Sequence, residues 1–191
     1  MSGVAPGPDG RLRCPWGLGA PDYLPYHDQE WGKPLHGDTA LFERVSLEAF
    51  QSGLSWITIL RKRPAFREAF AGFDPARVAA FDDSDVERLM ADAGIVRNRA
   101  KVNATIANAR AMLDLDGSFD ELLWSFAPRP PRDAPTGFGD VPAVTDESTA
   151  MAKELKRRGF RFVGPTTAYA LMQATGMVND HLADCAFRGA T

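Results

Sequence analysis

Residues 93–99 read AGIVRNR, and helical patterns adjoin this stretch on both sides. The preceding SDVERLMADAG (84–94) opens with a capping box at Ser84 and ends at a glycine, the signals of a helix start and stop. The following NRAKVNATIANARAMLDL (98–115) repeats apolar residues at helical spacing. With almost no loop between them, these two segments predict a helix–hairpin–helix around 84–113.

A hairpin of this kind suits phosphate binding. Gly94 lets the backbone turn, and amides at the start of the second helix are free to point outward beside Arg97, Arg99 and Lys101. The sequence therefore predicts a contact to DNA phosphates at these residues. The alternative is a packing unit that binds nothing, with Gly94 as a simple helix end.

The remainder of the chain predicts an all-α fold. The strongest helical signals cover 38–53, 73–81, 148–159 and 164–176. Only WITIL (56–60) and FRFV (160–163) look like strands, and both are too short to build a sheet. The proline-rich stretch 127–145 is expected to be a long loop.

The length of 191 residues suits one domain, which we expect over 13–191 after a flexible leader at 1–12. The chain has neither a signal peptide nor an apolar run long enough to span a membrane, so a cytoplasmic protein is expected. Its two cysteines are then thiols or metal ligands rather than a disulfide. A net charge of −3 argues only weakly against a nucleic-acid partner, because a local basic surface matters more than the sum.

A metal-like pair lies near the end of the chain in NDHLADC (179–185). On a helix, His181 and Cys185 would share one face. Cys14 and His27 near the start complete two thiols and two imidazoles, a set suited to a closed tetrahedral zinc site. From the spacing alone, packed histidines and inert core thiols remain the simpler interpretation.

Glu48 lies at the border of the apolar face of helix 38–53, where an exposed ion pair with Arg44 is one interpretation. The other is a ligand pocket, because aromatic residues crowd the same region of the sequence. A carboxylate among aromatic rings would hold a flat cationic heterocycle by stacking, cation–π attraction and hydrogen bonds. The aromatic residues are Trp16, Tyr23, Tyr26, Trp31 and Trp56.

Several stretches together resemble the bacterial 3-methyladenine DNA glycosylase I family of the helix-hairpin-helix glycosylases. They cover roughly residues 13–185 in order and are specific as a set. They are RCPW (13–16), YHDQEWG (26–32), LEAFQSGLSWITIL (47–60), DAGIVRNRAKV (92–102), WSF (124–126), LKRRGFRFVG (155–164) and MVNDHLADC (177–185).

The resemblance implies a two-lobed helical fold, with a structural zinc joining the two ends of the chain through Cys14, His27, His181 and Cys185. It also implies a base pocket with Glu48 as the key carboxylate. Tyr26, Trp31 and Trp56 surround the base, and Trp16 and Tyr23 are further candidates.

The expected reaction is hydrolysis that releases 3-methyladenine from double-stranded alkylated DNA, by a monomer acting at the nucleoid. No aspartate after the hairpin and no lysine is placed as a catalyst, which predicts a monofunctional enzyme. Leu54, at the tip after Gly53, is the expected wedge into the base stack. The alternatives are a zinc-stapled helix-hairpin-helix DNA-binding module without activity, or a glycosylase with broader specificity for alkylated bases.

Overall fold

The computed structural model describes residues 3–189 and is mostly helical, as predicted. A short antiparallel strand pair near the N-terminus places Ala5 opposite Arg13. The elements are β1 (Ala5–Pro6), β2 (Leu12–Arg13), α1 (Tyr23–Gln29), α2 (Asp38–Gln51), α3 (Trp56–Ala69), α4 (Pro75–Ala79), α5 (Asp83–Ala91), α6 (Arg99–Leu113), α7 (Phe119–Trp124), α8 (Asp146–Arg157) and α9 (Pro165–Ala174), with short 3₁₀ turns at Pro15–Leu18, Ala71–Phe73 and Phe138–Asp140.

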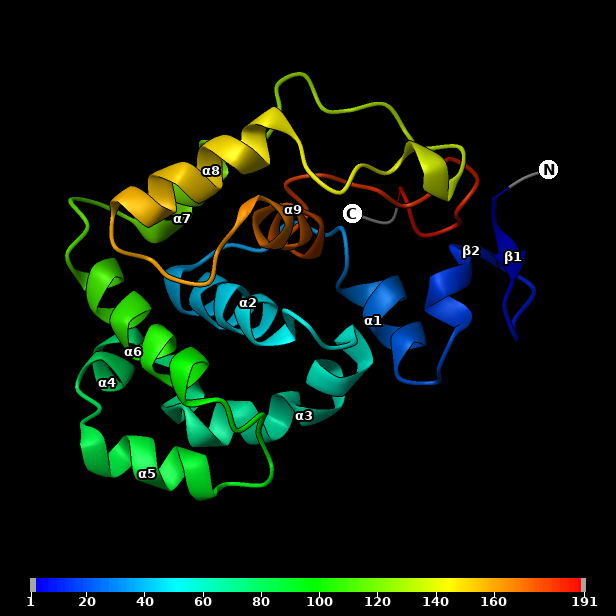
Figure 1. Cartoon of the computed structure of the whole chain (residues 1–191). Helices are drawn as coiled ribbons and strands as arrows, with labels where there is room; N and C mark the ends of the chain where they lie inside the picture. Colours follow the sequence, from blue (N-terminus) through cyan, green and yellow to red (C-terminus); the bar gives the residue numbers. More distant parts are fainter. Residues whose placement is uncertain (1–2, 190–191) are drawn as a thin grey trace.

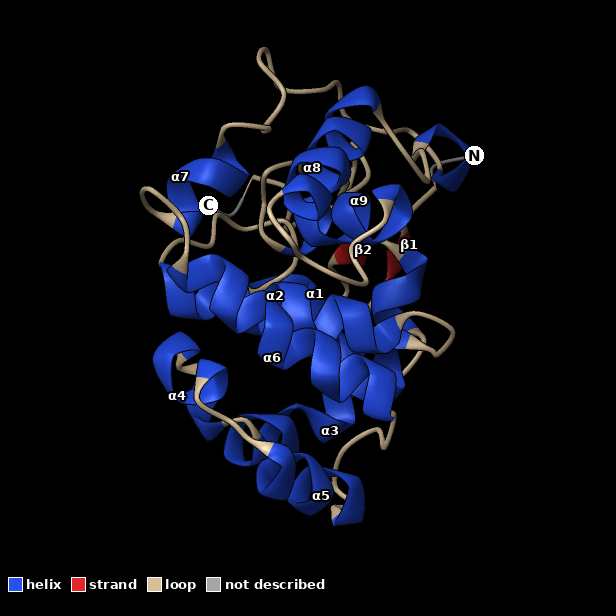
Figure 2. Cartoon of the chain, turned by 60° about the vertical axis from the view of Figure 1, so that its left-hand side comes forward, coloured by secondary structure: helices blue, strands red, loops and turns tan. Residues whose placement is uncertain are grey.

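Helix α2 forms the centre of the molecule. Figures 1 and 2 show α3, α4, α5 and α6 on one side of it and α7, α8 and α9 on the other. Helix α2 contacts α3, α6, α7 and α9, so both groups of helices pack on it. Its side chains Leu41, Phe42, Val45 and Phe50 are fully buried, and burying each stabilises the fold by about 1.5–3 kcal/mol. A helix buried on several sides can hold a polar side chain deep inside the protein.

The two ends of the described chain lie together. The amide of Ala186 donates to the carbonyl of Leu12 at 2.9 Å, and the amide of Leu182 donates to the Cys14 sulfur at 3.3 Å. The segment 1–12, predicted as a flexible leader, thus contains β1 and the first residue of β2, and that residue, Leu12, bonds to the C-terminal segment. None of the helices within residues 3–189 is long and apolar enough to cross a membrane.

Two strand predictions are wrong. WITIL (56–60) begins helix α3, and FRFV (160–163) is an irregular link between α8 and α9. Short apolar runs fit a strand and a buried helix equally well, so the tertiary packing decides between them.

The cap of α5 also differs from the prediction. Asp82 rather than Ser84 accepts the hydrogen bonds of the first turn, and Asp85 reciprocates. Its carboxylate is a stronger acceptor than the expected hydroxyl.

Candidate active site

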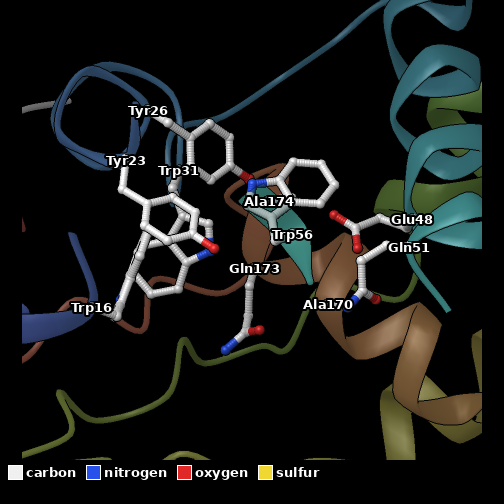
Figure 3. Close-up of a pocket in the computed structure, with 10 residues that line it drawn as sticks. All are labelled: Trp16, Tyr23, Tyr26, Trp31, Glu48, Gln51, Trp56, Ala170, Gln173 and Ala174. Atoms are coloured by element: carbon white, nitrogen blue, oxygen red, sulfur yellow. The ribbon is translucent and has the colours of Figure 1, made fainter. Parts of the chain in front are cut away.

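Glu48 projects from the last two turns of α2 into a cavity between α1, α2, α3 and α9 (Figure 3). The residue is only 5% exposed. Burial raises the pKa of its carboxyl from the ordinary 4.5 to about 7, because desolvation disfavours the charged form. Within residues 3–189 no donor hydrogen-bonds to this carboxylate, so the charged form has no direct partner in the free protein.

The alternative interpretation, an exposed ion pair between Arg44 and Glu48, does not hold in the structure. Arg44 donates instead to Glu30 at 3.2 Å, and its guanidinium lies 5.6 Å from the centre of the Tyr26 ring. Glu30 also accepts two hydrogen bonds from Arg63, at 2.6 and 2.8 Å. This pairing holds Arg44 away from Glu48, and the arginine acts on Glu48 only as a nearby charge that lowers its pKa slightly against the effect of burial.

The cavity has a volume of about 250 Å³ and contains all six residues that the sequence placed in a base pocket. In Figure 3 the aromatic rings form one side and the top, and the oxygens of Glu48 approach from the opposite side beside Gln51. The lining residues are Trp16, Tyr23, Tyr26, Trp31, Glu48, Gln51, Trp56, Ala170, Gln173 and Ala174. Ring packing makes this wall rigid: Trp16 lies 4.8 Å from Trp31 and 5.7 Å from Tyr23.

Two polar groups of the aromatic wall have no hydrogen-bond partner within residues 3–189. Tyr26 is buried, and desolvation raises its phenol pKa, so the hydroxyl stays neutral and keeps its proton to donate. The indole Nε1 of Trp56 is buried without a partner among the described residues. Tyr23, by contrast, accepts a hydrogen bond from the amide of Ile57 at 3.0 Å and so braces the start of α3.

Sequence reasoning missed Gln51 and Gln173. The sequence could have identified Gln51, because it follows Glu48 by three residues and therefore lies on the same helix face. Gln173 comes from α9, and no local pattern links that helix to α2. Its Nε2 donates to Asp180 at 2.9 Å, which fixes how the amide is oriented.

A cluster of possible metal ligands lies behind this wall. One donor atom each from Cys14, His27 and Cys185 lies within 4.8 Å of the others, and all three residues are buried. His27 binds Asp28 through Nδ1 at 2.7 Å, which leaves Nε2 facing the Cys185 sulfur at 3.6 Å. An imidazole oriented by a carboxylate is the usual arrangement around a bound metal. Hydrogen bonds from Cys14 and His27 also lower the thiol pKa of Cys185.

His181, the predicted fourth ligand, lies beside this cluster rather than within it, and its role as a ligand stays a prediction. Its ring lies 4.6 Å from the ring of His27, yet its Nε2 lies 3.2 Å from the carbonyl oxygen of His27. Nδ1 is 3.1 Å from Asn179 Oδ1. The structure therefore groups three of the four predicted ligands and leaves His181 beside them. The set of two thiols and an imidazole suits a soft or borderline metal ion.

The sequence model of the methyladenine glycosylase family matches residues 16–189. The chain belongs to this family. It is 48% identical over 177 residues to DNA-3-methyladenine glycosylase 1 of Escherichia coli (strain K12), covering 91% of this chain and 95% of that protein.

Solved structures of the family agree with the fold. A crystal structure of 3-methyladenine DNA glycosylase I, 47% identical, superposes with a TM-score of 0.88 and covers 91% of this chain and 98% of that one. A variant of 3-methyladenine DNA glycosylase I in complex with 3-methyladenine is 39% identical, with a TM-score of 0.87 over 92% of this chain and 97% of that one.

The residues predicted to face DNA are Leu54, Gly94, Arg97, Arg99 and Lys101. Leu54 is 40% exposed in the turn between α2 and α3, where a wedge would have to lie. Arg97 is exposed, and no carboxylate in the described part of the chain pairs with it. Arg99 pairs with Glu87 at 2.7 Å, and both side chains are at least half exposed. An exposed pair of this kind is weak, so Arg99 could exchange Glu87 for a phosphate.

Gly94 and Lys101 do not face an incoming phosphate as predicted. The amide of Gly94 donates to Asp92 at 2.7 Å. Lys101 is 7% exposed, and its ammonium donates to the carbonyls of Phe50 at 2.9 Å and Ser52 at 2.6 Å. Neither group can bind a phosphate without giving up these bonds, because both are already satisfied inside the protein.

A second helical hairpin was missed. Residues 158–164 join α8 to α9, and the amides of Phe162, Val163 and Gly164 donate to no acceptor within residues 3–189. Hydrogen bonds of 2.7 and 3.1 Å between Asn108 and the backbone of Arg161 hold this link against α6. The sequence does carry a signal for this hairpin. A basic helix end with Gly159 is followed closely by Pro165, which opens α9, and together they indicate two helices joined by a short link.

Proposed function

We propose that this protein is a monofunctional DNA glycosylase that removes 3-methyladenine from alkylated double-stranded DNA. The observation that carries the proposal is the buried, unpartnered carboxylate of Glu48 facing a rigid aromatic wall. The family assignment and the relatives named as 3-methyladenine glycosylases support the same activity.

The chemistry of the substrate fits this cavity. Methylation at N3 makes the attached adenine cationic, so the base is already a good leaving group and needs little acid catalysis. Reaching the cavity requires the nucleotide to be flipped out of the duplex. The aromatic wall then stacks on the base and attracts its charge, while Glu48 accepts hydrogen bonds from its exocyclic nitrogen. Trp56 Nε1 and the Tyr26 hydroxyl are free donors for its ring nitrogens.

Hydrolysis then needs only water. The bond between sugar C1′ and base N9 breaks, and both electrons pass to N9, which neutralises the base. A water oxygen forms the new bond to C1′ and loses a proton to solvent. Glu48 stabilises the positive charge that moves from the base toward the sugar, in a site with little water to screen it.

The cavity offers no nucleophile for lyase chemistry. A lyase needs an amine that forms a Schiff base with the sugar, and lysine does not occur among the lining residues. Asp180, which follows α9, is 5% exposed and accepts hydrogen bonds from Tyr169 and from Gln173 at 2.5 and 2.9 Å. That carboxylate is engaged in holding the wall.

We further propose that Cys14, His27 and Cys185 hold a structural zinc ion, with His181 as the nearest candidate for the fourth position. The donor set fits zinc, because thiolates and imidazole are its preferred ligands. Zinc bound there would neutralise the thiolates and link the N-terminal segment to the C-terminal one. The ion would leave the chemistry of the base pocket to Glu48.

For DNA binding, we propose the α8–α9 hairpin as the main phosphate site, supported by its unpaired amides. Lys156 and Arg161 line the hollow in this hairpin, and Phe162 is 44% exposed there. Arg97 and Arg99 remain proposed as accessory contacts, and Leu54 as the wedge. We propose that the protein acts on duplex DNA as a monomer.

The direct test is to incubate the protein with methylated duplex DNA and to identify the released bases by chromatography. Release of free 3-methyladenine without strand cleavage is the expected result. Strand cleavage would contradict the monofunctional assignment. An absence of released base from a preparation that still binds duplex containing an abasic analogue would favour the alternative of a DNA-binding module.

A further inference from the structure

Lys101 is a buried lysine that the proposed function leaves without a role. It is the third residue of α6, in the helical hairpin 84–113, and the whole residue is only 7% exposed. Burying an ammonium is unfavourable unless it is hydrogen-bonded. The bonds to the carbonyls of Phe50 and Ser52 meet that requirement.

Both carbonyls belong to the C-terminus of α2, where the last carbonyls of a helix lack a partner within it. A cation at this end also interacts favourably with the helix dipole. The chain turns sharply just beyond: Gly53 has a φ of 82°, and Leu54 is held to Gln51 by two hydrogen bonds of 2.6 and 2.7 Å. Lys101 thus fastens the base of the turn whose tip is Leu54.

A second lysine links α3, the helix that follows the turn, to the same hairpin. Lys62 on α3 donates to the carbonyls of Ala93 and Gly94, at 2.9 and 3.1 Å. The turn 52–55 is therefore tied to the 84–113 hairpin from both of the helices that flank it. The hairpin that the sequence assigned to DNA phosphates supports the turn that carries Leu54.

We propose that Lys101 is a positioning residue that holds the turn 52–55 in the shape that lets Leu54 enter the base stack, rather than a ligand of a DNA phosphate. The proposal rests on the glycosylase function above and assigns the insertion step to this contact. A flexible turn would have to be ordered each time Leu54 inserts, which weakens binding.

A double-mutant cycle tests this. Lys101→Met keeps the length of the stem and removes the ammonium, and Leu54→Ala removes the wedge. We would measure the affinity of both variants and of the double variant for a duplex containing a tetrahydrofuran abasic analogue, over a range of salt concentrations. Quenching of tryptophan fluorescence by free 3-methyladenine reports whether the base pocket is still folded.

Each single change is expected to weaken duplex binding by about ten-fold, which is about 1.4 kcal/mol. The double change should weaken it by about ten- to twenty-fold rather than a hundred-fold, because Lys101 acts through Leu54. The salt slope of Lys101→Met should equal that of the wild type. Arg161→Met, which removes a proposed phosphate contact, is the comparison and should flatten the slope by about 0.9.

Effects that multiply in the double variant would overturn the proposal, as would a salt slope flattened by about 0.9 in Lys101→Met, the value for one lost phosphate. Loss of quenching by the free base in Lys101→Met would also overturn it, since the lysine would then support the whole pocket. A failure of the proposed function is visible separately, because wild-type protein would then release no 3-methyladenine.

Discussion

Replacing Glu48 with glutamine changes charge and little else, because the amide has the shape of a protonated carboxyl. In the free protein the native side chain is 5% exposed and titrates at about 7, against 4.5 when unfolded. Between these two values the folded protein holds a proton that the unfolded chain has released. Stability therefore falls as the pH rises from 4.5 to about 7 and is level above that range.

The structure sets the size of this effect. At about 1.4 kcal/mol per pH unit, the raised pKa of Glu48 destabilises the folded state by about 3 kcal/mol at pH 8, where the buried carboxyl is ionised. At pH 5 the cost is about 1 kcal/mol, because the folded protein keeps a proton that the unfolded chain has mostly released. Glu48→Gln removes this destabilisation, because glutamine does not ionise. The variant should therefore be more stable than the wild type by about 3 kcal/mol at pH 8 and by about 1 kcal/mol at pH 5. Urea denaturation at the two pH values measures the difference, and the pH dependence of the metal cluster cancels because both proteins contain it.

Activity should change in the opposite direction. The charge that destabilises the free protein is what a cationic base satisfies on entering the cavity. Release of 3-methyladenine by Glu48→Gln should fall by about ten- to a thousand-fold, or roughly one to four kcal/mol. The wild-type kcat/KM should rise as the pH increases through about 7, and the profile of the variant should be flat over that range.

Binding to duplex with an abasic analogue is the matched control, since no base is present to contact Glu48, and it should barely change. The reasoning would be refuted by a variant that excises 3-methyladenine at the wild-type rate, or by one that is no more stable than the wild type at pH 8. Wild-type excision would mean that the charge of Glu48 does not act on the base, and an unchanged stability at pH 8 would mean that the carboxylate finds a partner in the free protein.

Two further predictions concern the surroundings of the pocket. Purified protein should contain one equivalent of zinc by elemental analysis, and Cys185→Ala should lose both the metal and stability, because metal binding and folding are coupled; a metal-free native protein that stays folded in chelator would disprove this. Trp56→Phe should weaken binding of free 3-methyladenine by about three- to ten-fold, the value of one hydrogen bond, without loss of stability, because Nε1 has no partner within residues 3–189. Fluorescence titration and thermal unfolding check this second prediction, and unchanged affinity would show that Nε1 does not contact the base.

Residues close in the sequence, or alike in a recognisable pattern, could be interpreted before the structure was known. Helix 38–53 followed from its spacing of apolar residues, and Glu48 stood out as the one carboxylate at the edge of its apolar face. Trp16, Tyr26, Trp31 and Trp56 lie within motifs that resemble the family, and only Tyr23 among the aromatic residues of the pocket lies outside them. Most of the residue set and the activity were therefore predictable. The capping and spacing signals of 84–113 predicted two helices joined by a short turn, and the structure has α5 and α6 there.

Which distant residues form hydrogen bonds or ion pairs with one another was determined only by the tertiary structure. Arg44 could have paired with Glu48 four residues away, but it donates instead to Glu30, which also binds Arg63. In the sequence Lys101 has the pattern of an exposed phosphate ligand, but in the structure its ammonium donates to the carbonyls of Phe50 and Ser52 at the C-terminus of α2. A local pattern specifies which face of a helix a side chain occupies, whereas burial and hydrogen-bond partners depend on what packs against that face. These long-range contacts determine whether a charge is screened by water or left unpaired in a cavity, and so whether it can act on a substrate.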